Sequence, residues 1–153
     1  MSTILQINLL KGLNNLPFGA TTLDAEAIFG KPEEVQTLDD PILEISSTVY
    51  HYWDKGFSLF FDNKNAKKFS SVEIDNDETE LFSKKIFDLS EQELIELMKQ
   101  HQFTLSDSEI QEWGEKRLSF DDAGLDCYFE RQSLSSINFG VVDEFNNFEF
   151  LPN

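Results

Sequence analysis

The chain has 153 residues, a formal net charge of −17, 15 phenylalanines and one cysteine. A chain of this length buries a core of its own without a metal or a disulfide, and its phenylalanines favour β-structure. The charge repels phosphate backbones and anionic lipids, which argues against direct binding to nucleic acid or to a membrane and favours a basic protein as partner. An acidic composition that serves only solubility is the alternative explanation.

The single cysteine and the N-terminal segment both bear on where the protein resides. One cysteine cannot form an intrachain disulfide, and Cys127 lies in an alternating apolar stretch, which predicts a buried residue rather than a reactive thiol. The apolar run at residues 4–10 is interrupted by Gln6 and Asn8 and follows no basic leader, so it differs from a signal peptide. No apolar run approaches the length that crosses a membrane. We therefore expect a cytoplasmic protein.

The first half predicts a strand, one short helix and then several more strands. Residues 4–10 alternate apolar and polar side chains as a strand does, although a short helix is an alternative. Thr21 or Thr22 can cap a helix that runs through Phe29 and stops at Gly30. Further strands are expected within residues 35–44 around a turn at 38–41, in a hairpin at 48–62 that turns at 54–56, and at 68–74.

The second half predicts a more strongly patterned helix and a further series of strands. The charged residues 75–80 suit a joint between two units. Ser90 followed by Glu93 has the spacing of a capping box, and the apolar stripe behind it predicts a helix to about His101. Strands are expected at 103–105, 109–113, 116–121, 124–130 and 134–142, and Phe145, Phe148 and Phe150 would anchor part of the tail.

Two stretches of the sequence match each other without gaps. Residues 35–62 align with residues 103–130, and the matches include Asp39 with Asp107, Ile42 with Ile110, Glu44 with Glu112, Asp54 with Asp122, Gly56 with Gly124 and Phe61 with Phe129. Because helix, hairpin and strand recur in the same order, we predict an internal repeat. The first repeat would span residues 1–76 with the N-terminal strand, and the second would span residues 77–153 with the phenylalanine-rich tail, the two together forming one compact unit.

The first unit carries a recognisable succession of glycine, proline and aromatic residues. Gly19-Ala20-Thr21 precedes the helix, Gly30-Lys31-Pro32 follows it, and the aromatic strands Tyr50-His51-Tyr52-Trp53 and Gly56-Phe57-Ser58-Leu59-Phe60-Phe61 come next. This pattern resembles the SmpA/OmlA small lipoproteins, and its tandem copy is similar to the doubled architecture of the β-lactamase inhibitor protein. The resemblance implies an α+β fold of two diverged repeats, with helices packed on one face of a mostly antiparallel sheet, and a non-catalytic use in binding a partner. The chain lacks a lipid-attachment cysteine and a signal sequence, so the envelope role of the lipoproteins is not carried over.

Side-chain alternation divides each predicted hairpin into a buried and an outer face, provided that its loop holds an even number of residues. The expected core residues are Tyr50, Tyr52, Phe57, Leu59 and Phe61 in the first hairpin and Leu118, Phe120, Leu125, Cys127 and Phe129 in the second. The outer face of the second hairpin is then polar and suits solvent, with Arg117, Ser119, Asp121, Asp126, Tyr128 and Glu130.

The outer face of the first hairpin is aromatic instead, and it is the candidate site. It comprises Val49, His51, Trp53 and Phe60, with the acidic residues Asp54, Asp62 and Glu44 near its rim. Clustered apolar surface marks an interaction site, and tryptophan is a favoured anchor in protein interfaces. Packing of this face against the N-terminal segment, the tail or an identical subunit is the alternative.

The side-chain inventory contains no catalytic or metal-binding motif. His51 and His101 are the only histidines, neither has metal-ligand spacing, and residues 75–80 do not match a calcium-binding loop. We therefore expect no metal and no cofactor. The leading hypothesis is a non-catalytic protein-binding module, such as an inhibitor or toxin-immunity protein that recognises a basic partner. The alternatives are a small-molecule-binding or enzymatic domain with a pocket between helices and sheet, and a homo-oligomeric structural module such as a homodimer.

Overall fold

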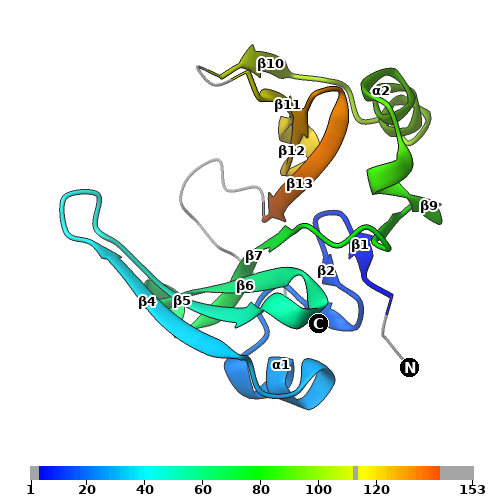
Figure 1. Cartoon of the computed structure of the whole chain (residues 1–153). Helices are drawn as coiled ribbons and strands as arrows, with labels where there is room; N and C mark the ends of the chain where they lie inside the picture. The colour runs from blue at the N-terminus through cyan, green and yellow to red at the C-terminus, as the bar shows by residue number, and fades with distance from the viewer. Residues whose placement is uncertain (1–3, 112–113, 142–153) are drawn as a thin grey trace.

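The computed structural model describes residues 4–111 and 114–141, which form two β-sheets and two short α-helices (Figure 1). The smaller sheet has five strands in the order β3-β2-β1-β8-β9. Its strands are β1 (Gln6–Asn8), β2 (Gly12–Leu13), β3 (Leu16–Pro17), β8 (Glu80–Leu81) and β9 (Lys84–Lys85). Strands β1 and β8 pair in parallel, whereas the other neighbours are antiparallel.

The larger sheet has eight antiparallel strands in the order β10-β11-β12-β13-β7-β6-β5-β4. The first half of the chain contributes β4 (Glu34–Asp40), β5 (Ile45–Tyr52), β6 (Phe57–Asp62) and β7 (Lys68–Ile74). The second half contributes β10 (Asp107–Ile110), β11 (Lys116–Phe120), β12 (Leu125–Glu130) and β13 (Ser133–Gly140). Strands β7 and β13 pair at the centre of the sheet, so β4 and β10 are its two edges.

Both α-helices begin at capping boxes. In α1 (Thr22–Phe29) the cap is Thr21, and in α2 (Glu91–Gln100) it is Ser90, whose hydroxyl accepts from the Glu93 amide. Such caps satisfy amide groups that otherwise have no partner in the first turn. The predictions of a helix from Ser90 to about His101, and of a helix through Phe29 that stops at Gly30, are confirmed.

The predicted α+β fold, with helices packed on one face of a single sheet, is wrong. Strands dominate the described residues and form two sheets, and the two α-helices have only eight and ten residues. The expectation failed because residues 4–10 look like one strand and residues 75–80 look like a charged joint, whereas Gln6 and Ile7 pair with Glu80 and Leu81 in the smaller sheet. Its hairpins turn at Leu10, Phe82 and Ser83, which have positive φ. Non-glycine residues rarely adopt that conformation, so these turns carry no sequence signal.

The core faces of the two hairpins are as expected, whereas Val49 and Ser119, expected on the outer faces, are buried. Tyr52 pairs with Phe57 and Phe120 pairs with Leu125, so each loop holds four residues. The loops are the 3₁₀ turns η1 (Trp53–Lys55) and η4 (Asp121–Ala123), each closed by a glycine with left-handed φ. The two other 3₁₀ turns are η2 (Asn63–Asn65) and η3 (Ile86–Asp88). All ten residues expected on the core faces are buried.

The core is one cluster of buried residues drawn from both sheets and both helices. Leu5, Ile7 and Leu81 join it from the small-sheet side, Ala25 and Phe29 from α1, and Leu94 and Met98 from α2. Both halves of the larger sheet have the order strand, strand, 3₁₀ turn, strand, strand, except that η2 lies between β6 and β7 in the first half. The pairings of β5 with β6 recur 68 residues later between β11 and β12. A shared origin of the two halves, and their division at residue 76, stay predictions.

Two of the sequence expectations concern positions that the structure does not describe. The strand expected at 109–113 begins earlier, as β10, and its Trp113 lies outside the described residues, as do Phe145, Phe148 and Phe150. Within residues 4–111 and 114–141, no helix is long and apolar enough to span a membrane.

Candidate functional site

The candidate site lies on the outer face of the larger sheet, where β4, β5 and β6 run side by side. In one row across these strands Glu34 pairs with His51 and His51 pairs with Ser58. In the next row Gln36 pairs with Val49 and Val49 pairs with Phe60. The face is therefore a mixture of aromatic and polar side chains.

His51 is the polar centre of this face. Its Nδ1 lies 2.8 Å from Ser58 Oγ, and its Nε2 lies 2.9 Å from Gln36 Oε1. Because the Gln36 carbonyl oxygen only accepts, Nε2 donates to it, and in the neutral imidazole Nδ1 accepts from the Ser58 hydroxyl. The imidazole is thus fixed by side chains from both neighbouring strands. Both ring nitrogens therefore have hydrogen-bond partners.

Trp53 stacks on His51, with ring centroids 5.0 Å apart and an interplanar angle of 18°. It is 56% exposed, a large aromatic surface open to solvent. A polar framework fixes its turn, because the Asp54 amide donates to Glu33 Oε1 at 2.8 Å and Asn76 Nδ2 donates to the Lys55 carbonyl at 2.7 Å. A turn held in this way orders the indole before any partner arrives, which lowers the entropy lost on binding.

Gly56 closes that turn, and both its backbone and its surroundings require glycine. Its φ is +75°, and an added Cβ would lie 2.9 Å from Asn76 Cβ and 3.2 Å from Asn76 Cα. Residues with a side chain are strained at this φ, and the contact is too close for a carbon atom. The glycine therefore allows the turn carrying Trp53 to pack tightly on the segment that follows β7.

The remaining predicted site residues are not gathered around Trp53. Val49 is 1% exposed and offers no surface to a partner in this conformation, and Phe60 is half-buried. Asp62 caps η2 by accepting from the Lys64 amide at 3.0 Å. Glu44 lies in the loop at the far end of β5, about 26 Å along this eight-residue strand from Trp53. Of the predicted set, the structure brings His51, Trp53 and Asp54 together.

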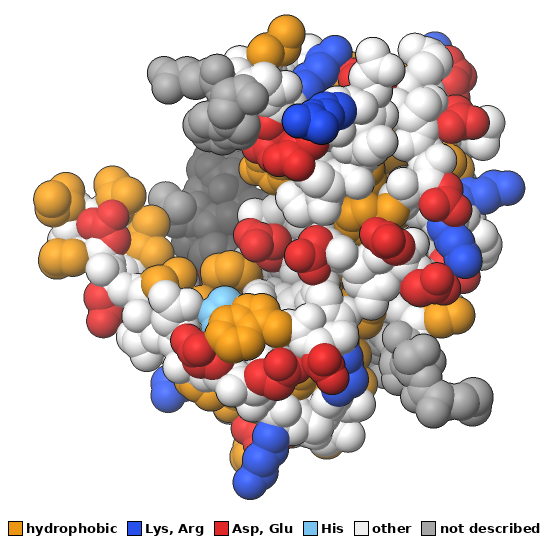
Figure 2. Space-filling view, viewed as in Figure 1, with side chains coloured by type: hydrophobic (Ala, Val, Ile, Leu, Met, Phe, Trp, Pro, Cys, Tyr) orange, Lys and Arg blue, Asp and Glu red, His pale blue; other side chains and the backbone are white. Residues whose placement is uncertain are grey.

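A second apolar surface escaped the sequence analysis. Five aliphatic side chains on the hairpin of β4 and β5 are exposed: Val35 55%, Leu38 42%, Ile42 90%, Leu43 65% and Ile45 53%. Hydrophobic side chains gather over this projecting hairpin in Figure 2. The turn was expected at 38–41, but β4 continues to Asp40, whose Oδ1 accepts from the amides of Ile42 and Leu43 at 3.1 and 3.2 Å. The adjacent pair Ile42 and Leu43, directly after a proline, is the sequence signal that could have revealed this tip.

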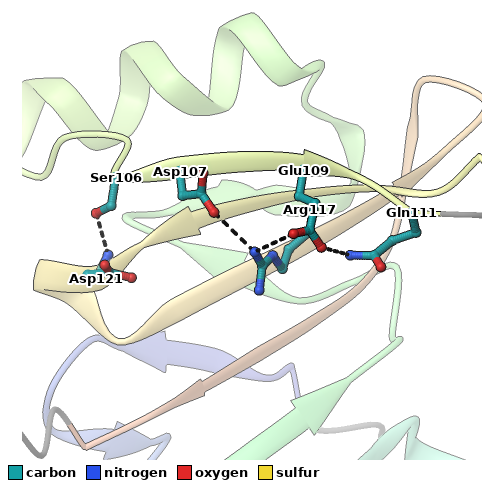
Figure 3. Close-up of polar contacts among 6 residues, drawn as sticks. All are labelled: Ser106, Asp107, Glu109, Gln111, Arg117 and Asp121. Atoms are coloured by element: carbon teal, nitrogen blue, oxygen red, sulfur yellow. Dashed lines mark hydrogen bonds and ion pairs between the residues drawn. The ribbon is translucent and has the colours of Figure 1, made fainter.

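The outer face in the second half of the chain is charged, as expected (Figure 3). Arg117 Nη2 lies 3.1 Å from Asp107 Oδ2 and 3.8 Å from Glu109 Oε2. Ser119 is an exception, because it is 4% exposed between Asp107 and Asp126 rather than open to solvent. Burial, and to a lesser extent the Asp126 carboxylate, raises the pKa of the Tyr128 phenol. Arg117 therefore lies between two carboxylates of β10.

A cavity of 370 Å³ lies against the smaller sheet. It is lined by Gln6, Ile7, Asn8, Leu9, Lys11, Glu80, Phe82, Ser83 and Phe103. Lys11 and Glu80 are its only charged lining residues, and the lining contains no histidine or cysteine. No group of three potential metal ligands occurs among residues 4–111 and 114–141. The cavity could hold a small polar ligand between Lys11 and Glu80.

Comparison with known proteins identifies the fold and no family. No family model and no curated protein matches the sequence. A solved extracellular protein containing an SCP domain, from Bacillus anthracis str. Ames, matches 81% of the chain with a TM-score of 0.52 and 11% identity. A DUF4309 family protein (YjgB) from Bacillus subtilis subsp. subtilis str. 168 matches 84% of this chain and 83% of its own, with a TM-score of 0.50 and 16% identity. The present chain spans 44% of the SCP-domain protein. At these identities the similarity shows a shared fold alone.

Proposed function

We propose that the chain is a non-catalytic, cytoplasmic protein-binding module that recognises a basic partner, in the manner of an inhibitor or a toxin-immunity protein. The observation that carries the proposal is Trp53, a solvent-exposed indole stacked on a hydrogen-bonded His51 and held by a fixed turn. Interface energy concentrates in such preordered aromatic anchors. The carboxylates of Glu33 and Asp54 beside it, and the net charge of −17, attract a basic surface and speed the encounter.

The test is capture of partners from extracts of the cells that produce the protein, with wild-type and variant chains immobilised side by side. We expect Trp53→Ala to lower recovery of a specific basic protein about tenfold, and added salt to weaken binding further. The matched control is Leu23→Ala, which removes a 76% exposed side chain from α1, away from the site. Equal recovery with Trp53→Ala and wild type would remove this surface from the proposal.

A second candidate function is small-molecule binding in the cavity beside the smaller sheet. Its favouring observation is the 370 Å³ volume between Lys11, Glu80 and Phe103. A ligand that binds only the folded state raises the melting temperature, and the stabilisation grows with the logarithm of its concentration relative to its dissociation constant. A metabolite panel that shifts the wild-type melting temperature but not that of Phe103→Ala would favour this function over protein binding. A homo-oligomeric structural role would instead appear as a concentration-dependent mass in light scattering.

A further inference from the structure

Strand β4 is an unprotected edge of the larger sheet. Its seven residues pair with β5 over their whole length without a bulge, and no described strand pairs with its other side. The strand contains no proline or lysine, two of the features by which proteins usually prevent pairing at an edge, and its charged side chains are all carboxylates. An edge of this kind presents a row of backbone donors and acceptors to solvent.

The opposite edge of the same sheet provides the contrast. Strand β10 has only four residues, and the Arg117 guanidinium of the neighbouring β11 contacts the carboxylates of Asp107 and Glu109 on it (Figure 3). A short, charged edge tied to the strand behind it is a poor template for another strand. The sheet therefore has one protected edge and one open edge.

The open edge also carries apolar side chains on the face that holds His51. Leu38 pairs with Ser47 and Asp40 pairs with Ile45, so Leu38 and Ile45 lie on this face as diagonal neighbours. Strand β6 ends at Asp62 opposite Ser47, and the hairpin continues past it toward the exposed Ile42. Asn63 braces this extension, because its Nδ2 donates to Ser46 Oγ at 2.9 Å. The hairpin is thus a supported apolar arm.

The charge around this arm selects the kind of partner. Residues 32–54 contain no lysine or arginine, and their carboxylates are Glu33, Glu34, Asp39, Asp40, Glu44 and Asp54. A second copy pairing antiparallel about Thr37 would place Glu34 opposite Asp40, and like charges directly opposite destabilise a strand pair. An anionic membrane is repelled by the same carboxylates. A basic, extended polypeptide could hydrogen-bond to the open backbone groups of β4, cover its exposed aliphatic side chains and neutralise its carboxylates.

From these observations we infer that β4 binds an extended segment of the partner as an additional strand, one that alternates apolar residues with lysine or arginine. This inference rests on the proposed protein-binding function and specifies how the partner is held. Backbone hydrogen bonds to β4 supply affinity, as in other cases of strand addition, and side-chain contacts supply selectivity. Because successive side chains of an added strand point to opposite faces, its apolar residues lie on the face of Leu38 and Ile45 and its cations lie on the opposite face, which carries Asp39.

The experiment titrates the isotopically labelled full chain with a synthetic peptide of alternating valine and lysine, as long as the seven-residue β4. We expect chemical-shift changes and slowed amide exchange along β4, with affinity falling about tenfold between about 0.05 M and 0.5 M salt. A peptide with glutamate in place of lysine, and one with a central proline, should each bind at least about tenfold more weakly, since one loses the charge match and the other a ladder hydrogen bond.

Variants distinguish peptide binding by the arm from nonspecific hydrophobic binding. Leu38→Ser combined with Ile42→Ser should weaken the valine–lysine peptide about tenfold, whereas Ile110→Ser, which removes a 73% exposed side chain from the β10 edge, should not. The inference is overturned by equal binding of the glutamate peptide, by changes at β10 instead of β4, by binding of the free chain to phosphatidylglycerol vesicles through this arm, or by dimerisation through β4. If capture of the partner requires Trp53 but the amide exchange of β4 is not slowed, the proposed function stands and strand addition fails. If Trp53→Ala leaves capture unchanged and the exchange of β4 is also unchanged, both proposals fail.

Discussion

Phe60 and Phe61 are adjacent in the chain and lie on opposite faces of β6, so they test the assignment of the scaffold and outer faces. Phe61 is 0% exposed, with its ring centroid 5.2 Å from that of Tyr50 and 5.9 Å from that of Phe69. Removing a fully buried phenylalanine ring costs about 3–5 kcal/mol through lost transfer energy and the cavity left behind. Phe60 is half-buried and lies outside the core cluster, so Phe60→Ala should cost about half as much or less.

The assay is urea denaturation at neutral pH, followed by tryptophan fluorescence, together with thermal unfolding. For a chain of this size each kcal/mol lowers the melting temperature by about 2–4 °C, so Phe61→Ala should lower it by about 6–20 °C. An unchanged denaturant slope would show that both variants report native stability rather than a different unfolded state. A loss for Phe60→Ala equal to or larger than that for Phe61→Ala would refute the reasoning, because the outer face would then be the better buried one.

Three further predictions concern single side chains. Cys127 is 0% exposed and burial raises the pKa of its thiol, so dithionitrobenzoate should label the native chain only through unfolding and should label it at once in urea; rapid native labelling would contradict this. Burial raises the pKa of Tyr52 above 10.0, so the folded state holds this proton more tightly. The stabilisation that arises from this pKa difference is complete below pH 10.0 and is lost as the pH rises through the pKa of the folded state. Tyr52→Phe should flatten this alkaline loss of stability and should cost about 1 kcal/mol, because it removes the hydrogen bond to the Gly30 carbonyl. Ser90→Ala should destabilise by about 1 kcal/mol and Ser90→Asp by much less, measured by urea unfolding, because only the alanine variant cannot accept from the Glu93 amide.

The local elements of the larger sheet could be predicted from sequence because each has a short-range cause. The spacing of Ser90 and Glu93 located the start of α2, and the glycine at position 56 located the turn of the first hairpin. Alternation then assigned Tyr52 and Leu59 to the core, since an even loop allows only one choice of face. These inferences needed no knowledge of the neighbouring strands.

The smaller sheet could not be predicted in this way because its strands have only two or three residues. Periodicity is not measurable over such lengths, and the pairing of Gln6 with Glu80 joins segments more than seventy residues apart. The cost of closing that loop is recovered by burying Leu5 and Leu81, a long-range contact that no local window contains. The fold class was misjudged for this reason.

The sequence correctly places Trp53 beside His51, but it overestimates the number of residues that gather around this pair. Trp53 and His51 lie together because they are two residues apart on a strand that continues into a fixed turn. Glu44 was placed near them because both lie close to β5 in sequence, but an extended strand separates its two ends by its full length. Alternation specifies which face a residue occupies and leaves its distance from other residues on that face to be worked out.

Strand β5 therefore links two surfaces rather than carrying one patch. At one end is the indole of Trp53, and at the other is the aliphatic tip at Ile42, with Val49 buried and Ser47 polar between them. An extended segment of about eight residues along the open edge of β4 is long enough to contact both ends. Contact with both ends would add the indole and the aliphatic tip to the backbone hydrogen bonds of the added strand.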